Sequence, residues 1–273
     1  MVSRRVLSLV AGGMALCLPT AALAQWENPF SFLSGDWTVT ARGNVVASPK
    51  YPGSDELSWF GFPSIKARRV GEPETFGAPD DPASMALIRS GSFRMGPSFR
   101  YISSRSPSDD NELIGLAKVP WTAELGAYAE YWPTNNFRGR VDVRYGFHGH
   151  EGVVADLAAD GFMRFAQWTF SLGPRLRVVS GNYQSAYFSV TPGESLASGG
   201  VLAPYSANAG LNSVGVGGSA SFRFNPQWEV TGYVRYDRLV GDAADSPITV
   251  QTGTANQWSF GAIVGYSFDI RIP

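Results

Sequence analysis

Apolar and polar residues alternate along the C-terminal part of the chain. In residues 214–224 and 228–236 every second residue is apolar or glycine, and the residues between them are mostly polar. The same pattern returns in 258–268. A period of two predicts β-strands, because successive strand side chains point to opposite faces of a sheet. These runs exceed the usual strand of about 5–6 residues and favour membrane-crossing strands, which need about 9–11.

Similar runs recur along the whole chain and together predict an all-β fold. The other expected strands are 36–46, 60–68, 84–90, 93–102, 121–132, 137–148, 153–165, 168–178 and 182–190. The total is about twelve, an even number as single-chain bacterial barrels require, and ten to twelve strands fit the pattern. We therefore predict one closed antiparallel transmembrane β-barrel domain over residues 25–273, with its apolar faces toward lipid.

The inward faces of the expected hairpins carry charges of opposite sign. Three expected registers place such charges side by side: Glu130 with Arg140, Asp156 with Arg177, and Arg223 with Glu229. Opposite charges across a ladder stabilise it by about 0.2–1 kcal/mol. The candidate lumen-lining residues are Glu124, Glu130, Arg138, Arg140, Asp142, Arg144, Asp156, Arg175, Arg177, Arg223, Glu229 and Arg235. We interpret them as paired structural charges, with an arginine-lined pore constriction as the alternative.

The connecting segments raise a conflict about the two ends of the barrel. The stretch 71–82 is acidic and rich in Pro and Gly, so we expect a solvated loop. With both termini in the periplasm, the long loops 191–208 and 240–256 lie outside the cell. The segments 71–82 and 103–119 then fall on the periplasmic side, where turns are usually short. Either an early strand is misassigned or the periplasmic face is elaborated.

Composition agrees with a barrel and excludes other classes. Charged residues make up 16% of the chain and aromatic residues 13%, with 31 glycines. Soluble proteins usually contain about 25% charged residues, so the charged share of this chain is low. The mean hydropathy of -0.08 is nevertheless too low for a helical membrane protein. The formal net charge of -1 gives no basic excess for nucleic acid. No motif indicates a cofactor, and we expect none.

The N-terminus predicts a secretory signal peptide over residues 1–24. Arg4 and Arg5 precede a short apolar run, and residues 22–24 (Ala-Leu-Ala) fit the small-x-small cleavage rule. The apolar run is shorter than the roughly 20 residues of a transmembrane helix. The only cysteine, Cys17, lies inside this segment, so we expect no thiol chemistry in the mature chain.

The two histidines are the candidate residues for chemistry. His148 and His150 lie beside Glu151 near the end of an expected strand. A metal site would need further ligands, which do not occur at useful spacing. Either histidine could act as the base of a lipid hydrolase, but no motif marks a serine nucleophile. We expect solvated strand-end residues, with neither a metal nor a catalytic site.

A loop near the C-terminus combines residues with special backbone preferences. It contains Gly241, Asp242, Asp245, Ser246 and Pro247. One interpretation is a latch between loops or a cation site. We favour turn chemistry, because Gly, Asp, Ser and Pro all support tight turns and Asp side chains bond nearby backbone N–H groups.

Several stretches resemble the MltA-interacting protein/OmpV family of outer-membrane proteins. They are 48–55 (SPKYPGSD), 172–176 (LGPRL), 187–192 (YFSVTP), 213–220 (SVGVGGSA), 233–239 (YVRYDRL) and 241–248 (GDAADSPI). One departure is that residues 269–273 follow Phe268, whereas barrels of this kind often end on an aromatic residue. The resemblance implies an outer-membrane barrel surrounded by lipid and lipopolysaccharide.

The resemblance also implies a role in the cell envelope. The family's best-known role is a scaffold that holds a lytic transglycosylase beside a murein synthase, and other members resemble solute-permeable barrels. Three hypotheses follow. The first is a non-enzymatic scaffold in the outer membrane, the second is a narrow pore for small polar solutes, and the third is a lipid-modifying enzyme that uses His148 or His150.

Overall fold

The structure, a computed structural model, describes residues 34–108, 110 and 113–273. The predicted signal peptide at 1–24 lies outside these residues. The ten long strands of the described part are β1 Gly35–Pro49, β2 Leu57–Arg69, β5 Phe93–Ile102, β6 Thr122–Thr134, β7 Phe137–Phe147, β8 Val153–Phe165, β9 Trp168–Val179, β10 Gly210–Arg223, β11 Trp228–Leu239 and β12 Asn256–Ile272. Two short strands, β3 Ala83–Ser84 and β4 Ile88–Ser90, bring the total to the predicted twelve.

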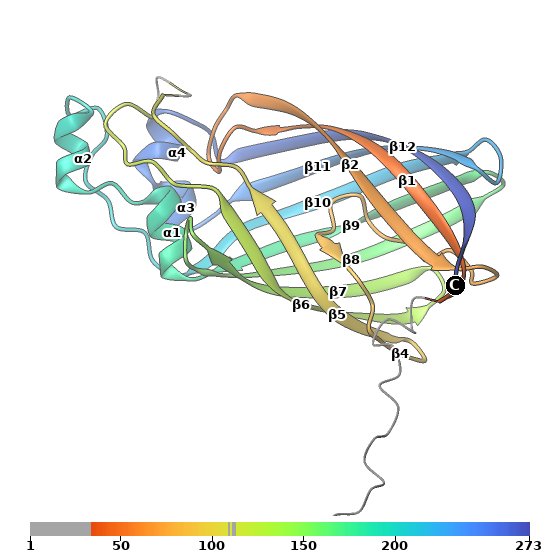
Figure 1. The fold of residues 1–273 in the computed structure, drawn as a ribbon. Helices are drawn as coiled ribbons and strands as arrows, with labels where there is room; N and C mark the ends of the chain where they lie inside the picture. The colour runs from red at the N-terminus through yellow and green to blue at the C-terminus, as the bar shows by residue number, and fades with distance from the viewer. Residues whose placement is uncertain (1–33, 109, 111–112) are drawn as a thin grey trace, which may run out of the picture.

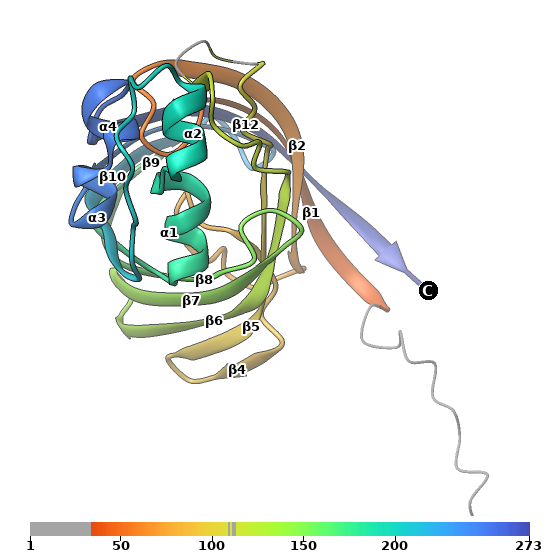
Figure 2. The same cartoon turned by 90° about the vertical axis from the view of Figure 1, so that its left-hand side faces the viewer.

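All the strands belong to one antiparallel sheet that curls into a barrel (Figure 1 and Figure 2). The order is β2-β1-β12-β11-β10-β9-β8-β7-β6-β5-β3, and β4 also pairs with β5. Because β1 pairs with β12, with Val39 opposite Phe268, the first and last strands meet. The sheet has two edges, β2 on one side and β5 with its short partners on the other. No ladder among the described residues joins these edges.

The alternation along each strand decides which side chains face outward. On β7, Phe137, Val141 and Phe147 are exposed, whereas Arg138 and Arg144 are buried. Large apolar side chains are also exposed on other strands, among them Trp59, Ile65, Tyr131, Met163, Leu172, Trp228, Trp258 and Val264. The three predicted registers are confirmed: Glu130 lies opposite Arg140, Asp156 opposite Arg177, and Arg223 opposite Glu229.

The two ends of the barrel differ in the length of their connections (Figure 1). The end with both described termini has the short turns 135–136, 166–167 and 224–227. Most of the long connections, among them 103–121, lie at the other end, whereas the long connection 70–82 lies at the end of the termini, as expected. The expectation that 103–119 shares the end of the termini is therefore wrong. The cause is the stretch 84–90, which forms only the short β4 and part of β3 and does not cross the barrel.

The predicted strand at 182–190 is also wrong, because this stretch forms helix α1, Gly181–Phe188. Tyr183 and Tyr187 lie one helical turn apart, and both are buried together with Phe188. Burial on one helical face outweighs the two-residue pattern in the sequence. The other helices are α2 Pro192–Ala197, α3 Asp242–Asp245 and α4 Pro247–Gln251. No helix in the described part of the chain is long and apolar enough to cross a membrane.

The helices form a cap at the end with the long connections (Figure 2). We define the cap as residues 180–209 and 240–255. Its apolar side chains pack against those of strand ends and of other connections in two clusters. One contains Val119, Val154, Val179, Tyr183, Tyr187, Phe188, Ala207, Leu239 and Ala243, and the other contains Tyr51, Leu113, Leu116, Val190, Leu202 and Ile248. Apolar burial thus holds the cap on the barrel mouth.

Candidate functional site

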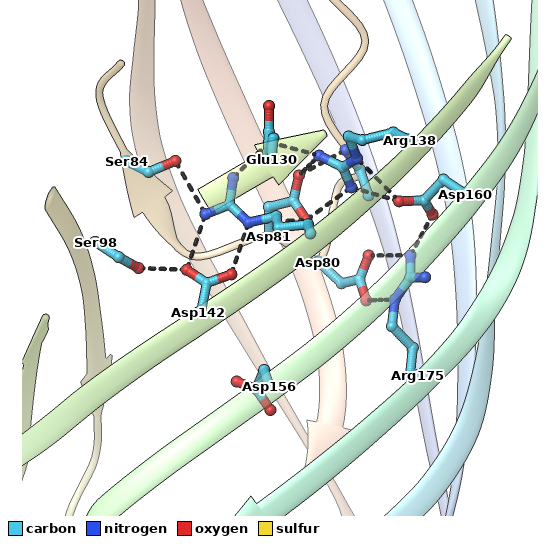
Figure 3. A network of polar contacts seen from close by, with 12 residues as sticks. Asp80, Asp81, Ser84, Ser98, Glu130, Arg138, Asp142, Asp156, Asp160 and Arg175 are labelled. Atoms are coloured by element: carbon cyan, nitrogen blue, oxygen red, sulfur yellow. Dashed lines mark hydrogen bonds and ion pairs between the residues drawn. The ribbon is translucent and has the colours of Figure 1, made fainter. Parts of the chain in front are cut away.

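A network of arginine and carboxylate side chains occupies the middle of the barrel (Figure 3). β7 contributes Arg138, Arg140, Asp142 and Arg144 at alternate positions, so all four face inward. Nε of Arg140 donates to Asp142 at 2.6 Å, and Nη1 of Arg140 donates to Glu130 on β6 at 2.8 Å. Adjacent strands therefore satisfy much of the charge that they place in the lumen.

Arg138 is the centre of the part of this network nearest the short turns. Its side chain is fully buried, and its Nε donates to Oδ2 of Asp160 at 3.1 Å. Asp160 is fully buried as well and accepts a second bond from Nη2 of Arg175 at 2.8 Å. Nη1 of Arg138 also donates to Glu130 at 3.1 Å. Since an unpaired buried charge is costly, each member stabilises its neighbours.

A second group of the predicted residues meets closer to the cap. Nε of Arg144 donates to Glu124 at 2.9 Å. Asp156 accepts from Nη2 of Arg144 at 2.5 Å and from Nε of Arg177 at 2.7 Å. Strands β6 to β9 thus bring four sequence candidates into one chain of ion pairs.

The remaining predicted residues lie on β10 and β11, apart from the ion pairs of Arg144 and Asp156. Arg223 and Glu229 pair at 2.8 Å near the short turns, where the Arg223 side chain is 46% exposed. Arg235 lies deeper, and its Nη2 donates to Asp237 at 2.9 Å. The predicted residues therefore form a distributed lining of the lumen and not a single compact site.

A segment that is not part of the wall enters the barrel from the short-turn end. We name residues 71–82 the lumen segment. The prediction of a solvated loop is wrong for its second half, where Ala78 is buried and the Asp81 side chain is only 14% exposed. Asp81 accepts from Nη1 and Nη2 of Arg138 at 2.6 and 3.1 Å. Phe76 stacks on Phe162, with ring centroids 4.5 Å apart.

Asp80, the preceding residue of the lumen segment, is held by Arg175 (Figure 3) and by an arginine of a further strand. Nε and Nη2 of Arg175 on β9 donate to its two carboxylate oxygens at 2.8 and 3.2 Å. Nη1 of Arg235 on β11 donates to Oδ2 at 2.9 Å. Sequence reasoning missed both aspartates, because it assigned the lumen only to residues of the strands.

With the lumen segment in place, little space remains between these side chains. A cavity of about 20 Å³ lies among Asp80, Arg100, Arg140, Asp156 and Arg235. A cavity needs about 10–15 Å³ to hold one water molecule. This cavity thus has room for about one water molecule and not for a larger solute.

The two histidines occupy different environments at the cap end. His148 is exposed and stacks on Trp121, with ring centroids 4.4 Å apart. His150 is buried, its Nδ1 accepts from the Gly152 N–H at 3.0 Å, and its Nε2 faces Oε1 of Glu124 at 3.2 Å. Both ring nitrogens of His150 thus have partners, and neither faces a serine. No group of three His, Cys, Asp or Glu that could hold a metal occurs among the described residues.

The glycine- and aspartate-rich loop connects two parts of the cap. Oδ2 of Asp242 accepts from the backbone N–H of Asn208 at 2.7 Å and from its Nδ2 at 3.0 Å. Oγ of Ser246 donates to the C=O of Phe188 at 2.6 Å and accepts from the Ile248 N–H at 3.3 Å. Turn chemistry and a latch between loops, the two interpretations of the sequence, therefore coexist here.

The other residues of this loop shape its backbone. Gly241 has φ 55, which glycine adopts at little cost, and it is the N-cap residue of α3. Ser246 is the N-cap of α4 and Pro247 takes its first turn, as their preferences predict. Asp245 is exposed.

On α1, burial raises the pKa of the Tyr187 phenol above its ordinary range.

Two outer-membrane proteins are similar to this chain in sequence. Outer membrane protein Omp26La of Vibrio anguillarum is 32% identical over 172 residues, and outer membrane protein OmpV of Vibrio cholerae is 36% identical over 172 residues. Each match covers 58% of this chain and 59% of the relative, so the chain spans about three fifths of their length.

Similar solved structures include a NanC porin and a bacterial polysaccharide outer membrane secretin. They have TM-scores of 0.39 and 0.41 and identities of 10% and 8%. They cover 86% and 85% of this chain, and 100% and 98% of their own chains. The family model described as MltA-interacting protein MipA matches residues 43–268. On this match, the chain belongs to the MltA-interacting protein MipA family and is an outer-membrane protein.

Proposed function

We propose that the protein is a non-enzymatic scaffold of the outer membrane, which holds a lytic transglycosylase beside a murein synthase during cell-wall remodelling. The observation that carries this proposal is the filled lumen. Ion pairs and the lumen segment occupy its middle, with a cavity of about 20 Å³, and the apolar cap core covers one mouth. We expect a barrel whose middle is occupied in this way to act through its surfaces. The name of the family, MltA-interacting protein MipA, supports an MltA-type partner.

The proposed docking surface is the end that carries the termini, which we place in the periplasm. The hairpin of β4 and β5 lies at this end and stands out from the barrel wall (Figure 2), and Gly91 is in its turn. A side chain at Gly91 would meet nothing within 4 Å. The outer wall contacts lipid and, in the outer leaflet, lipopolysaccharide through the exposed apolar residues.

The test is cross-linking in intact envelopes followed by capture of the tagged protein. A short Ser-rich insertion after Gly91 disrupts the proposed surface. A matched insertion after Gly199 alters the cap instead. Gly199 also has a positive φ, and a side chain there would also meet nothing within 4 Å. We expect a lytic transglycosylase or murein synthase with the wild type and the Gly199 insertion, but not with the Gly91 insertion. Equal recovery of these enzymes from all three proteins contradicts the docking surface at Gly91, and recovery of insertion machinery alone contradicts the scaffold.

The proposal includes a closed barrel in the membrane. The free edge of β2 would leave backbone N–H and C=O groups unpaired in lipid, which costs several kcal/mol for each group. We propose that β2 closes against the stretch 83–90. Double-cysteine variants test this closure. Each combines a cysteine at position 87 with one at Trp59, Phe62 or Ile65, and the cross-linker is a short bis-maleimide. Closure predicts cross-linking in one register only. The absence of any cross-linked pair contradicts it.

A second candidate is a narrow pore that opens when the lumen segment leaves. Polar contacts favour it, because Asp80 and Asp81 are held mainly by ion pairs to Arg175, Arg235 and Arg138. Ion pairs can exchange with water and solute, unlike a packed apolar core. Planar-bilayer conductance tests the pore. Silence of the wild type under all voltages and salts would remove this candidate.

The non-enzymatic part of the proposal rests on His150. Its two ring nitrogens are committed to Gly152 and Glu124, so it has no free nitrogen to activate a nucleophile. We expect His148→Ala and His150→Asn together to leave lipid A and phospholipid profiles unchanged. Any change in either profile, with the barrel still folded, contradicts this assignment.

A further inference from the structure

The contacts of Asp80 are those of a ligand in a binding site. Two guanidinium groups, from Arg175 and Arg235, grip its carboxylate with three hydrogen bonds of 2.8 to 3.2 Å. Nη2 of Arg100 donates to its backbone C=O at 3.1 Å. A planar guanidinium fork matches the two oxygens of a carboxylate. The donors come from β9, β11 and β5, whereas Asp80 belongs to the lumen segment and not to the wall.

The wall of this site is built independently of Asp80. Arg175 also donates to Asp160 at 2.8 Å, and Arg235 also donates to Asp237 at 2.9 Å. On the adjoining strand β10, a side chain at Gly217 would meet Nη2 of Arg175 at 3.1 Å, so glycine leaves room for the guanidinium. Each arginine therefore keeps a partner and a position when Asp80 is absent, while the site gains positive charge.

We propose that Asp80 is an internal ligand of an anion site in the lumen, and that this site takes the carboxylate group of a small solute when Asp80 is away. The adjacent cavity of about 20 Å³ leaves no room for both at once, so the two compete. A tethered carboxylate has a high effective concentration, which keeps free carboxylates out of the resting protein. The proposal rests on the pore candidate only for the route by which a solute reaches the site.

The test replaces the internal ligand with a free one. Asp80→Ala removes the carboxylate and leaves its donors, and acetate is the probe, compared with chloride at equal ionic strength. We expect acetate to raise the urea midpoint of Asp80→Ala in detergent micelles, with a saturable dependence in the millimolar range. We expect no such rise for the wild type, whose site is filled, or for Asp80→Asn, whose amide still fills the space.

Glu74→Ala is the matched control, because it removes a carboxylate of the same segment from the half-exposed Arg223. An equal acetate effect in Glu74→Ala, or no acetate effect in Asp80→Ala, overturns the proposal. If Asp80→Ala does not fold alone, refolding yield becomes the readout. Acetate must then raise the yield above that in chloride, and failure to do so also overturns the proposal. Acetate binding by a barrel that never conducts would remove the pore and leave this site standing.

Discussion

Asp81 and Arg138 lie 57 positions apart in the chain, yet Oδ2 of Asp81 is 2.6 Å from Nη1 of Arg138 in the middle of the barrel. Arg138 belongs to the wall and Asp81 to the segment inserted into the lumen. The pair ties the segment to the wall ion pairs with Asp160 and Glu130, so the stability of the barrel and the position of the segment depend on the same guanidinium.

Arg138→Ala should strongly destabilise the barrel. The change leaves Asp160, which is fully buried, with Arg175 as its remaining cation. Removing one member of a buried ion pair costs about 3–5 kcal/mol. The measurement is urea unfolding in lipid vesicles, followed by tryptophan fluorescence. Arg271→Ala is the control. Arg271 pairs with Asp36, and their side chains are 79% and 50% exposed, so we expect little change in the urea midpoint. Equal midpoints for the two variants would contradict the structural role of Arg138.

Neutralising the lumen segment should open the barrel. Asp80→Asn combined with Asp81→Asn removes the charges that Arg175, Arg235 and Arg138 hold. The segment should then leave the lumen more often, and the exposed arginines should favour anions over cations. Single-channel recording measures both the open probability and the reversal potential in a salt gradient. Glu74→Gln, at the half-exposed end of the segment, should behave like the wild type. A double variant as silent as the wild type would mean that the segment does not gate.

Ser246→Ala should loosen the cap without unfolding the barrel. The hydroxyl is fully buried, donates to the Phe188 C=O at 2.6 Å and caps α4. Loss of these bonds should cost about 1–2 kcal/mol in the local opening of the cap. Hydrogen exchange of the backbone N–H groups of residues 248–251 measures this opening. Asp245→Ala, at the exposed neighbouring position, should leave the exchange nearly unchanged. Faster exchange throughout the strands would instead indicate global destabilisation.

The features predictable from the sequence were those set by neighbouring strands. A short turn and a period of two fix the register, so the pairs Glu130–Arg140 and Asp156–Arg177 followed directly. The error at 182–190 arose because Tyr183, Tyr187 and Phe188 are apolar or aromatic at spacings that suit either a strand or a helix. Burial against the barrel mouth decides for the helix, and this burial depends on residues far along the chain.

The lumen segment could not be predicted from local patterns. Asp80 meets Arg235 across 155 positions, and the strand pattern does not encode such a contact. A signal was nevertheless present. An acidic segment fell on the side where turns should be short, opposite a lumen rich in arginine. Electrostatic complementarity between Asp80, Asp81 and those arginines resolves the conflict, because the segment lies inside the barrel.

Acid should release the cap at α2. Glu194 accepts at 2.8 Å from the N–H groups of Thr191 and Ala117, which ties α2 to the connection 103–121. Burial opposes the charge, but these hydrogen bonds hold the pKa of Glu194 below its ordinary value. The stabilisation is therefore complete above the ordinary Glu pKa of about 4.3 and is lost as pH falls through the lower folded value. Hydrogen exchange at Ala117 and Thr191, corrected for intrinsic rates, should show protection that disappears in this acidic range. Glu194→Gln should show weaker protection that does not vary with pH there, and the same acid dependence in this variant would assign the effect to another group.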